Sequence, residues 1–153
     1  MEELILALHT HSIFSDGNGT HTQIGEASLK AGIDALIVTD HNVWVSGPED
    51  YYHEGDRRML LLVGEEVHDR TRNPQKNHLL IFGAEKELAP LGHSPQAVID
   101  ATAKAGGLAF LAHPYDPAAP AIATNQAASH SAIAAIFHPP CRLLPCPLTL
   151  VYP

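Results

Sequence analysis

The sequence of 153 residues contains only two cysteines, so it offers no disulfide framework, and a reducing cytoplasm is the expected compartment. No apolar run exceeds six residues, which is far below the length of a membrane span. The N-terminal segment has no basic residue ahead of its apolar run, unlike a secretory signal. Basic residues are few, nine against 17 acidic residues, and the net charge of −8 argues against non-specific binding to nucleic acids. We therefore expect a cytoplasmic globular protein with no membrane partner.

The last part of the chain has no acidic residue at all. All 17 acidic residues lie in 1–117, whereas residues 118–153 contain six prolines, nine alanines and a single basic residue. Proline at this density prevents regular hydrogen-bonded ladders. We therefore predict a domain over 1–117 and an Ala/Pro-rich tail over 118–153 that is non-native or disordered. Cys141 and Cys146 fall in this tail and are interpreted as inert residues rather than zinc ligands.

The first part of the chain alternates predicted strands and helices. Apolar runs of four or five residues are typical of strands buried on both faces, and a helical apolar period marks the segments between them. The predicted strands are 4–8, 35–38, 59–63, 79–82 and 108–111, and the predicted helices are 20–31 and 95–104. Strands separated by helices or long loops indicate an α/β protein with a parallel sheet or a β/α barrel.

Histidines and carboxylates gather at the ends of these predicted strands. Ligand sites of α/β folds lie at the carboxyl ends of parallel strands, so such residues are expected to converge. Alternate residues of a strand face the same way, which places His9 and His11 together, about 7 Å apart. Imidazole and carboxylate ligands suit Zn, Mn, Fe or Ni rather than Ca. The candidate ligands are His9, His11, Asp16, His41, Glu66, His78 and His113, with His78 at a strand start or on a loop that reaches over.

Other polar residues receive simpler interpretations. Six histidines that do not end a predicted strand are taken as ordinary polar residues: His21, His53, His68, His93, His130 and His138. Glu65 competes with Glu66 as a ligand, but its position in the strand predicts an outward-facing side chain. The arginines predicted on loops, any of which could clamp a phosphate, are Arg57, Arg58, Arg70 and Arg72.

Five motifs together resemble a known family. In order, LHTHSIFSDG (8–17), VTDHN (38–42), GEEV (64–67), NHLLIFG (77–83) and AHP (112–114) resemble the motifs of the PHP superfamily of polymerase-associated and histidinol-phosphatase-type phosphoesterases. The resemblance covers about residues 4–117 and is greatest to the stand-alone phosphoesterases. It implies a distorted (β/α)7 TIM-like barrel that binds up to three divalent metal ions, such as Mn, Zn or Fe.

The resemblance also implies a role for each candidate. His9 and His11 would bind the first metal ion, and Glu66 would bridge the first and second. His78 and His113 would complete the second site, and Asp16 and His41 would hold the third. His9, His11, Asp16, Glu66 and His113 would be catalytic. The family also has a late Asp-x-His motif, which this sequence lacks. We therefore expect a truncated, N-terminal portion of the barrel without its C-terminal strands, holding fewer than three ions, with the second site retained best.

Three functions stay open at this point. The first is a metal-dependent phosphoesterase that hydrolyses a small phosphorylated substrate or nucleotide with a metal-activated hydroxide. The second is a catalytically impaired or inert metal-binding remnant of such an enzyme. The third is a metal-dependent hydrolase of other ester or C–N bonds, which would use the same ligands. An open barrel would also expose apolar strand edges, which favour self-association.

Overall fold

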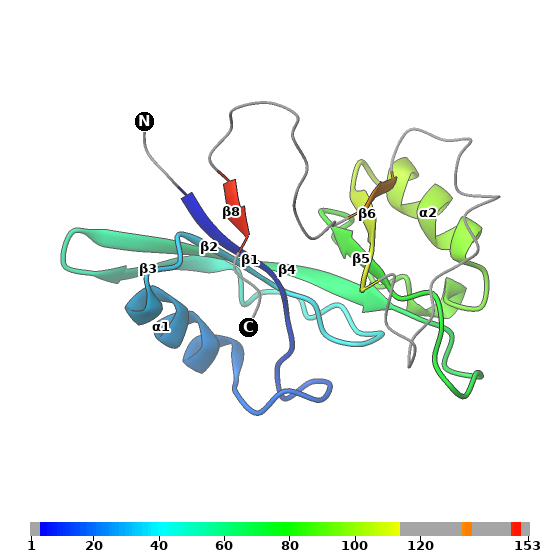
Figure 1. Cartoon of the computed structure of the whole chain (residues 1–153), viewed down its shortest axis with the longest axis horizontal. Coiled ribbons are helices and arrows are strands. Elements are labelled where there is room, and N and C mark those ends of the chain that lie inside the picture. Colours follow the sequence, from blue (N-terminus) through cyan, green and yellow to red (C-terminus); the bar gives the residue numbers. More distant parts are fainter. Residues whose placement is uncertain (1–3, 114–132, 136–147, 151–153) are drawn as a thin grey trace.

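The computed structural model describes residues 4–113, 133–135 and 148–150 of the chain (Figure 1). The elements follow one another as strand β1 (Leu4–Thr10), helix α1 (His21–Ala31), strands β2 (Ala35–Val38), β3 (Asp50–Glu54), β4 (Arg57–Val67) and β5 (Leu79–Phe82), the 3-10 helix η1 (Ala89–Leu91), helix α2 (Pro95–Lys104), and strands β6 (Leu108–Leu111), β7 (Ile133–Ala135) and β8 (Leu148–Leu150). Neither α1 nor α2 is long and apolar enough to cross a membrane.

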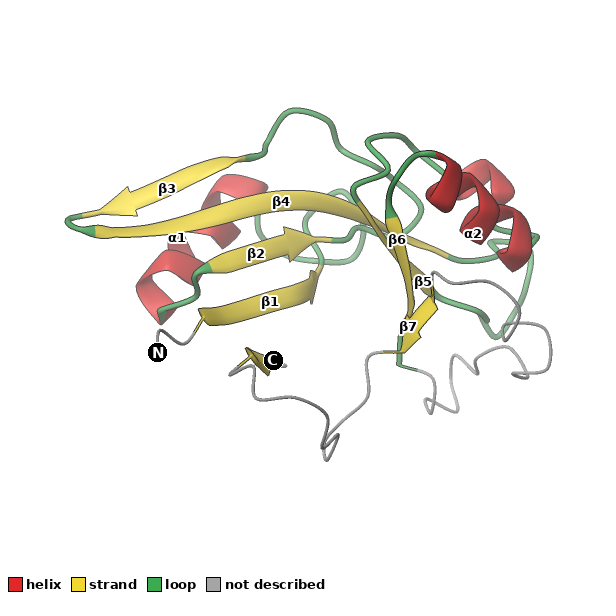
Figure 2. Cartoon of the chain, turned by 90° about the horizontal axis from the view of Figure 1, so that it is seen from above, coloured by secondary structure: helices red, strands yellow, loops and turns green. Residues whose placement is uncertain are grey.

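The long strand β4 joins the two halves of an eight-stranded sheet (Figure 2). The strand order is β7-β6-β5-β4-β2-β1-β8, and β3 pairs with the first part of β4. At Gly64 the neighbour of β4 changes from β2 to β5, and a Cβ atom there would lie 2.6 Å from the carbonyl oxygen of Ile81. Glycine therefore lets the two halves approach closely at this crossing. The sheet curls into a half-barrel, which is compatible with a partial barrel.

The sheet is mixed rather than wholly parallel. β1, β2 and β4 are parallel neighbours, as expected, but β5 runs antiparallel to both β4 and β6. The connection 68–78 contains no helix and enters β5 at the edge where β4 ends, whereas a parallel neighbour would need a crossover back to the other edge. The direction of β5 explains why His78, at a strand start, shares an edge with residues at strand ends.

The predicted tail contains two described strands. β7 pairs with β6, and β8 pairs with β1, both in parallel. The remainder of residues 118–153, including Cys141 and Cys146, lies outside the described residues. The division near Pro117 and the non-native character of the tail therefore stay predictions.

The predicted helices are confirmed, and local signals account for their ends. The Thr20 side chain accepts a hydrogen bond from the Gln23 N–H, and the Gln23 side chain accepts one from the Thr20 N–H, which forms a capping box. Gly32 ends α1 with a φ of 91°, which an L side chain rarely adopts. Each helix covers one half of the sheet: α1 packs over the core around Leu36 and Leu61, and α2 packs over the core around Ile81.

Candidate metal centre

The predicted ligands converge on one edge of the sheet. β1, β2, β4 and β6 all end at this edge, and β5 begins there. The pairing continues one step past β2, where His41 bridges Glu66 in parallel register and the Asn42 N–H donates to the Glu66 carbonyl at 2.9 Å. Because these backbones are locked together, side chains far apart in sequence are held side by side.

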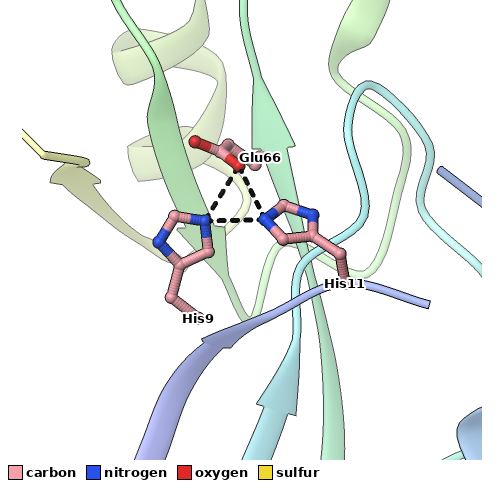
Figure 3. Close-up of side chains that lie close together, drawn as sticks. All are labelled: His9, His11 and Glu66. Atoms are coloured by element: carbon pink, nitrogen blue, oxygen red, sulfur yellow. Dashed lines mark hydrogen bonds and ion pairs between the residues drawn. The ribbon is translucent and has the colours of Figure 1, made fainter. Parts of the chain in front are cut away.

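Glu66 is the centre of the arrangement. Its side chain is fully buried, and its Oε2 lies 2.9 Å from His9 Nε2 and 3.2 Å from His11 Nε2 (Figure 3). These two ring nitrogens, one from His9 near the end of β1 and the other from His11 just beyond the end of β1, are themselves 3.0 Å apart. The other carboxylate oxygen, Oε1, lies 2.8 Å from His78 Nδ1 and 3.0 Å from His113 Nε2. One carboxylate thus faces histidines from three strands or their flanking loops.

Asp16 approaches the same cluster from the solvent side. Its carboxylate lies 3.6 Å from His11 Nδ1 and 3.5 Å from His41 Nε2, and its side chain is 68% exposed. The structure therefore brings all seven predicted ligands together. Six of them form three groups in which the ligand atoms lie within 4.8 Å of one another, and the seventh is in direct contact with Glu66. The three groups are His9–His11–Glu66, His11–Asp16–His41 and His41–Glu66–His78, and His113 contacts Glu66.

A buried carboxylate fixes the loop that carries Asp16. Asp40 accepts hydrogen bonds from the Ser12 N–H at 2.7 Å and from the hydroxyls of Ser12 and Ser15, both at 2.6 Å. The loop also folds back so tightly that a Cβ atom at Gly17 would overlap the carbonyl of His11. Asp16 is therefore positioned by its neighbours in the loop and not by its own burial.

The charges of the cluster call for a cation. Burial by itself would raise the pKa of Glu66, but hydrogen bonds from His11, His113, His78 and His9 hold it well below its usual range. His41 presents both ring nitrogens to carboxylates, Nδ1 to Glu66 at 3.3 Å and Nε2 to Asp16. A neutral imidazole carries only one N–H, and burial lowers the pKa of His41, which disfavours the doubly protonated ring. A divalent metal ion would neutralise the charge of Glu66 and would let a neutral His41 face two carboxylates. The donor set therefore fits a metal centre.

Whereas the pKa of His41 is lowered, that of His11 is raised. Burial disfavours its charged form, but the hydrogen bond to Glu66 and the nearby Asp16 outweigh burial and raise the pKa above 6.5. The protonation of His11 is therefore tied to the negative charges of Glu66 and Asp16.

Two histidines interpreted as ordinary polar residues are buried at this edge. His68 is 5% exposed, and burial together with His78 and His41 lowers its pKa to about 4. His21 is also 5% exposed, and its Nε2 lies 3.9 Å from Asp40. A signal for His68 existed, because it stands two residues after Glu66 and alternate residues of a strand share a face.

The side chain of Glu65 was expected to face outward, but it is buried. It lies on the face of β4 opposite Glu66, as the alternation predicted, but its side chain is 1% exposed instead of facing solvent. Its carboxylate accepts hydrogen bonds from the N–H groups of Leu88 and Ala89, at 2.7 and 3.0 Å, where η1 begins. Burial raises the pKa of Glu65 to about 7, although these two N–H groups oppose the shift.

Only two of the four candidate arginines lie near the cluster. Arg57 and Arg58 are not on a loop but begin β4, nine and eight residues before Glu66, so they lie about 25–30 Å away along the strand. Arg70 and Arg72 follow β4, at the edge of the sheet where the predicted ligands converge. Arg72 is paired with Asp69 at 3.0 Å, whereas Arg70 donates to the neutral carbonyl of Asn42 at 2.7 Å.

The raised pKa of Glu65 predicts a pH-dependent stability difference. An acid whose folded pKa is raised binds its proton more tightly in the folded state, so the stability it contributes is lost as pH rises from about 4.5 to about 7. Each pKa unit is worth about 1.4 kcal/mol, so Glu65→Gln should gain up to about 3 kcal/mol relative to the unsubstituted protein over this range. Urea unfolding of metal-free protein at several pH values measures the difference, with exposed Glu87→Gln as the matched control. A difference that does not change with pH would contradict the assignment.

Comparisons with known proteins agree with the geometry. The model of the family described as PHP domain matches residues 7–128. An uncharacterized protein of Methanocaldococcus jannaschii is 30% identical over 104 residues, which cover 68% of this chain. The matched segment spans 57% of the length of that relative. The family match contains all seven residues of the candidate metal centre.

Proposed function

The chain belongs to the PHP domain family, and from that premise we propose that it is a metal-dependent phosphoesterase that acts on a small phosphorylated substrate. Membership of this family indicates a metal-dependent hydrolase superfamily with divalent metal ions. We propose in addition that the substrates are phosphate esters, that the ions are Mn, Zn or Fe, and that a distorted seven-stranded barrel surrounds the site. The observation that carries the proposal is the buried carboxylate of Glu66, which has imidazole nitrogens directed at both of its oxygens.

The residues present divide the work of such a site. His9, His11 and Glu66 would hold one ion, and Glu66 would share a second with His78 and His113. When bound, divalent ions act as Lewis acids that lower the pKa of water, and the resulting hydroxide is a nucleophile at neutral pH. The ions also neutralise the charge of the phosphate. Glu66 keeps its negative charge because its histidine partners hold its pKa low. Asp16, exposed at the rim, marks the side of the cluster that is open to substrate.

The proposal is tested by hydrolysis assays on the full chain. Metal-free protein would be given Mn or Zn and assayed with p-nitrophenyl phosphate, bis(p-nitrophenyl) phosphate, p-nitrophenyl acetate and a chromogenic amide. We expect p-nitrophenol to be released from a phosphate ester. A chelator and the substitution His9→Ala should each abolish this activity, whereas the substitution His53→Ala, at an exposed position, should retain it. Turnover of only the acetate or the amide would favour a hydrolase of other bonds. Metal binding without any turnover would favour the impaired remnant.

Arg70 is expected to contribute to substrate binding. Its guanidinium donates to the carbonyl of Asn42 beside the turn of His41 and Asn42, and it forms no ion pair among the described residues, although its charge interacts with Glu65. We therefore expect it to bind an anion beside this turn. One charge-assisted hydrogen bond is worth about 1.5 kcal/mol or more, so Arg70→Ala should raise the KM for a phosphate ester by about tenfold with little change in kcat. Arg72→Ala is the matched control, because Asp69 already neutralises Arg72, and should change KM by less than about twofold. Equal effects of the two substitutions would exclude a specific role for Arg70.

A further inference from the structure

His68 packs against the candidate metal centre without belonging to it. Its ring lies face to face on the ring of His78, with centroids 4.7 Å apart and an interplanar angle of 19°. It also meets the ring of His41 edge-on, with centroids 5.1 Å apart and an angle of 85°. Both neighbours are predicted ligands from other parts of the chain, so the ring of His68 contacts two predicted ligands at once.

The backbone of His68 is held where this packing needs it. The Asn42 side-chain oxygen accepts a hydrogen bond from the His68 N–H at 3.0 Å. Asn42 itself has a φ of 52°, a left-handed conformation in which its own N–H reaches the Glu66 carbonyl. Asn42 thus ties the turn that follows His41 to the end of β4 at two points. The ring of His68 is thereby fixed relative to both of its partners.

The ring face of His68, and not its Nδ1, makes the contact. Within the described part of the chain, Nδ1 of His68 is buried and has no hydrogen-bond partner. Its ring nitrogens also belong to none of the three described groups whose ligand atoms lie within 4.8 Å of one another. A buried polar nitrogen without a partner costs free energy, so a carbon in the place of Nδ1 should be tolerated.

The orientation of His78 matters for the site. His78 directs Nδ1 at Glu66, so a rotation of the ring about its bond to Cβ would turn that nitrogen away. A flat surface stacked on one face limits this rotation. Residues that orient a ligand from outside the ligand set typically change metal affinity by about 10- to 100-fold when they are substituted.

We propose that His68 is a positioning residue of the metal centre, whose ring face holds His78 and His41 in their binding orientations without coordinating the ion. This inference rests on the proposed metal centre and adds a residue to it. His68 would therefore influence how tightly and with what geometry the ion is bound, and would influence catalysis only through that geometry.

The test compares a flat ring with a side chain that fills the same space without one. Metal-free full-length protein would be titrated with Co²⁺, following the visible absorption of the bound ion and the heat of binding, for the unsubstituted protein, His68→Phe and His68→Leu. We expect His68→Phe to retain the affinity within about threefold and the absorption spectrum, whereas His68→Leu should bind about 10- to 100-fold more weakly with an altered spectrum. Exposed His53→Ala, on β3, is the matched control and should bind as the unsubstituted protein does.

Two results would overturn the inference. If His68→Phe binds as weakly as His68→Leu, a ring nitrogen is needed, and the ring face does not by itself position the ligands. If His68→Leu binds like the unsubstituted protein, the stacking positions nothing. Far-ultraviolet circular dichroism of each metal-free variant shows whether it is folded. Absence of Co²⁺ binding by the unsubstituted protein is a separate outcome that would overturn the metal centre itself, and with it this inference.

Discussion

Glu66→Gln should reduce hydrolysis of a phosphate ester by about a thousandfold and weaken metal binding by more than about a hundredfold. Within the described residues, this carboxylate is the group that contacts His9, His11, His78 and His113 together. Its replacement by an amide removes the negative charge that would be shared between two ions. The lost charge is worth several kcal/mol in the transition state, and about 1.4 kcal/mol corresponds to each tenfold in rate.

Glu65→Gln is the matched control for that substitution. Glu65 is the preceding residue and is equally buried, but its carboxylate faces η1 on the other side of β4. The control should bind metal within a few-fold of the unsubstituted protein, as measured by calorimetric titration. Equal losses in the two variants would indicate a general disturbance of β4 and would contradict the assignment of Glu66.

Asp40→Ala should lower the free energy of unfolding by about 3 to 5 kcal/mol. The substitution leaves the Ser12 N–H and the hydroxyls of Ser12 and Ser15 without their acceptor in a site where Asp40 is 1% exposed. A lost hydrogen bond to a buried charge costs about 1.5 to 3 kcal/mol, and the three share one carboxylate, so their costs are not fully additive. For a chain of this length the melting temperature should fall by roughly 10 °C.

The loop that carries Asp16 should be released in the same variant. Thermal unfolding and metal titration of Asp40→Ala would be compared with those of Asp100→Ala. Asp100 is an exposed acid on α2 whose side chain accepts a hydrogen bond from Gln96. The control should change stability by less than about 0.5 kcal/mol. A melting temperature of Asp40→Ala within 2 °C of the control would show that the loop does not depend on this carboxylate.

The residues of the metal centre were predictable because short-range signals placed them. Apolar runs marked the strands, and polar residues followed directly, so the convergence of His9, His41 and His113 needed only a shared strand direction. The direction of β5 was not available from such signals. Its antiparallel pairing depends on where the loop 68–78 leads the chain, which is a tertiary property.

The hairpin of β3 and β4 was missed for a different reason. Residues 50–54 read Asp-Tyr-Tyr-His-Glu, a mostly exposed strand without an apolar run. A signal was present in the turn, since Gly55 and Asp56 form a two-residue connection between the paired residues Glu54 and Arg57. Glycine followed by aspartate between two potential strands is typical of such hairpins.

Burial of polar residues was the least predictable feature. His68 and Glu65 are charged or polar types that usually stay at the surface, and nothing in their local sequence states which element will cover them. Glu65 is covered by η1, more than 20 positions later in the chain, and His68 is covered by the loop that precedes β5. Local periodicity indicates which face of β4, or of its continuation, each of these residues lies on, but their burial depends on long-range packing, which periodicity does not encode.

The most direct measurement is the anomalous scattering of crystals of the full chain grown with Mn or Zn. A metal centre predicts an anomalous peak at the edge of the sheet, about 2.0 to 2.3 Å from a carboxylate oxygen of Glu66 and from ring nitrogens of His9 and His11 or of His78 and His113. Anomalous peaks found only at exposed histidines such as His53 and His93, with none beside Glu66, would contradict it.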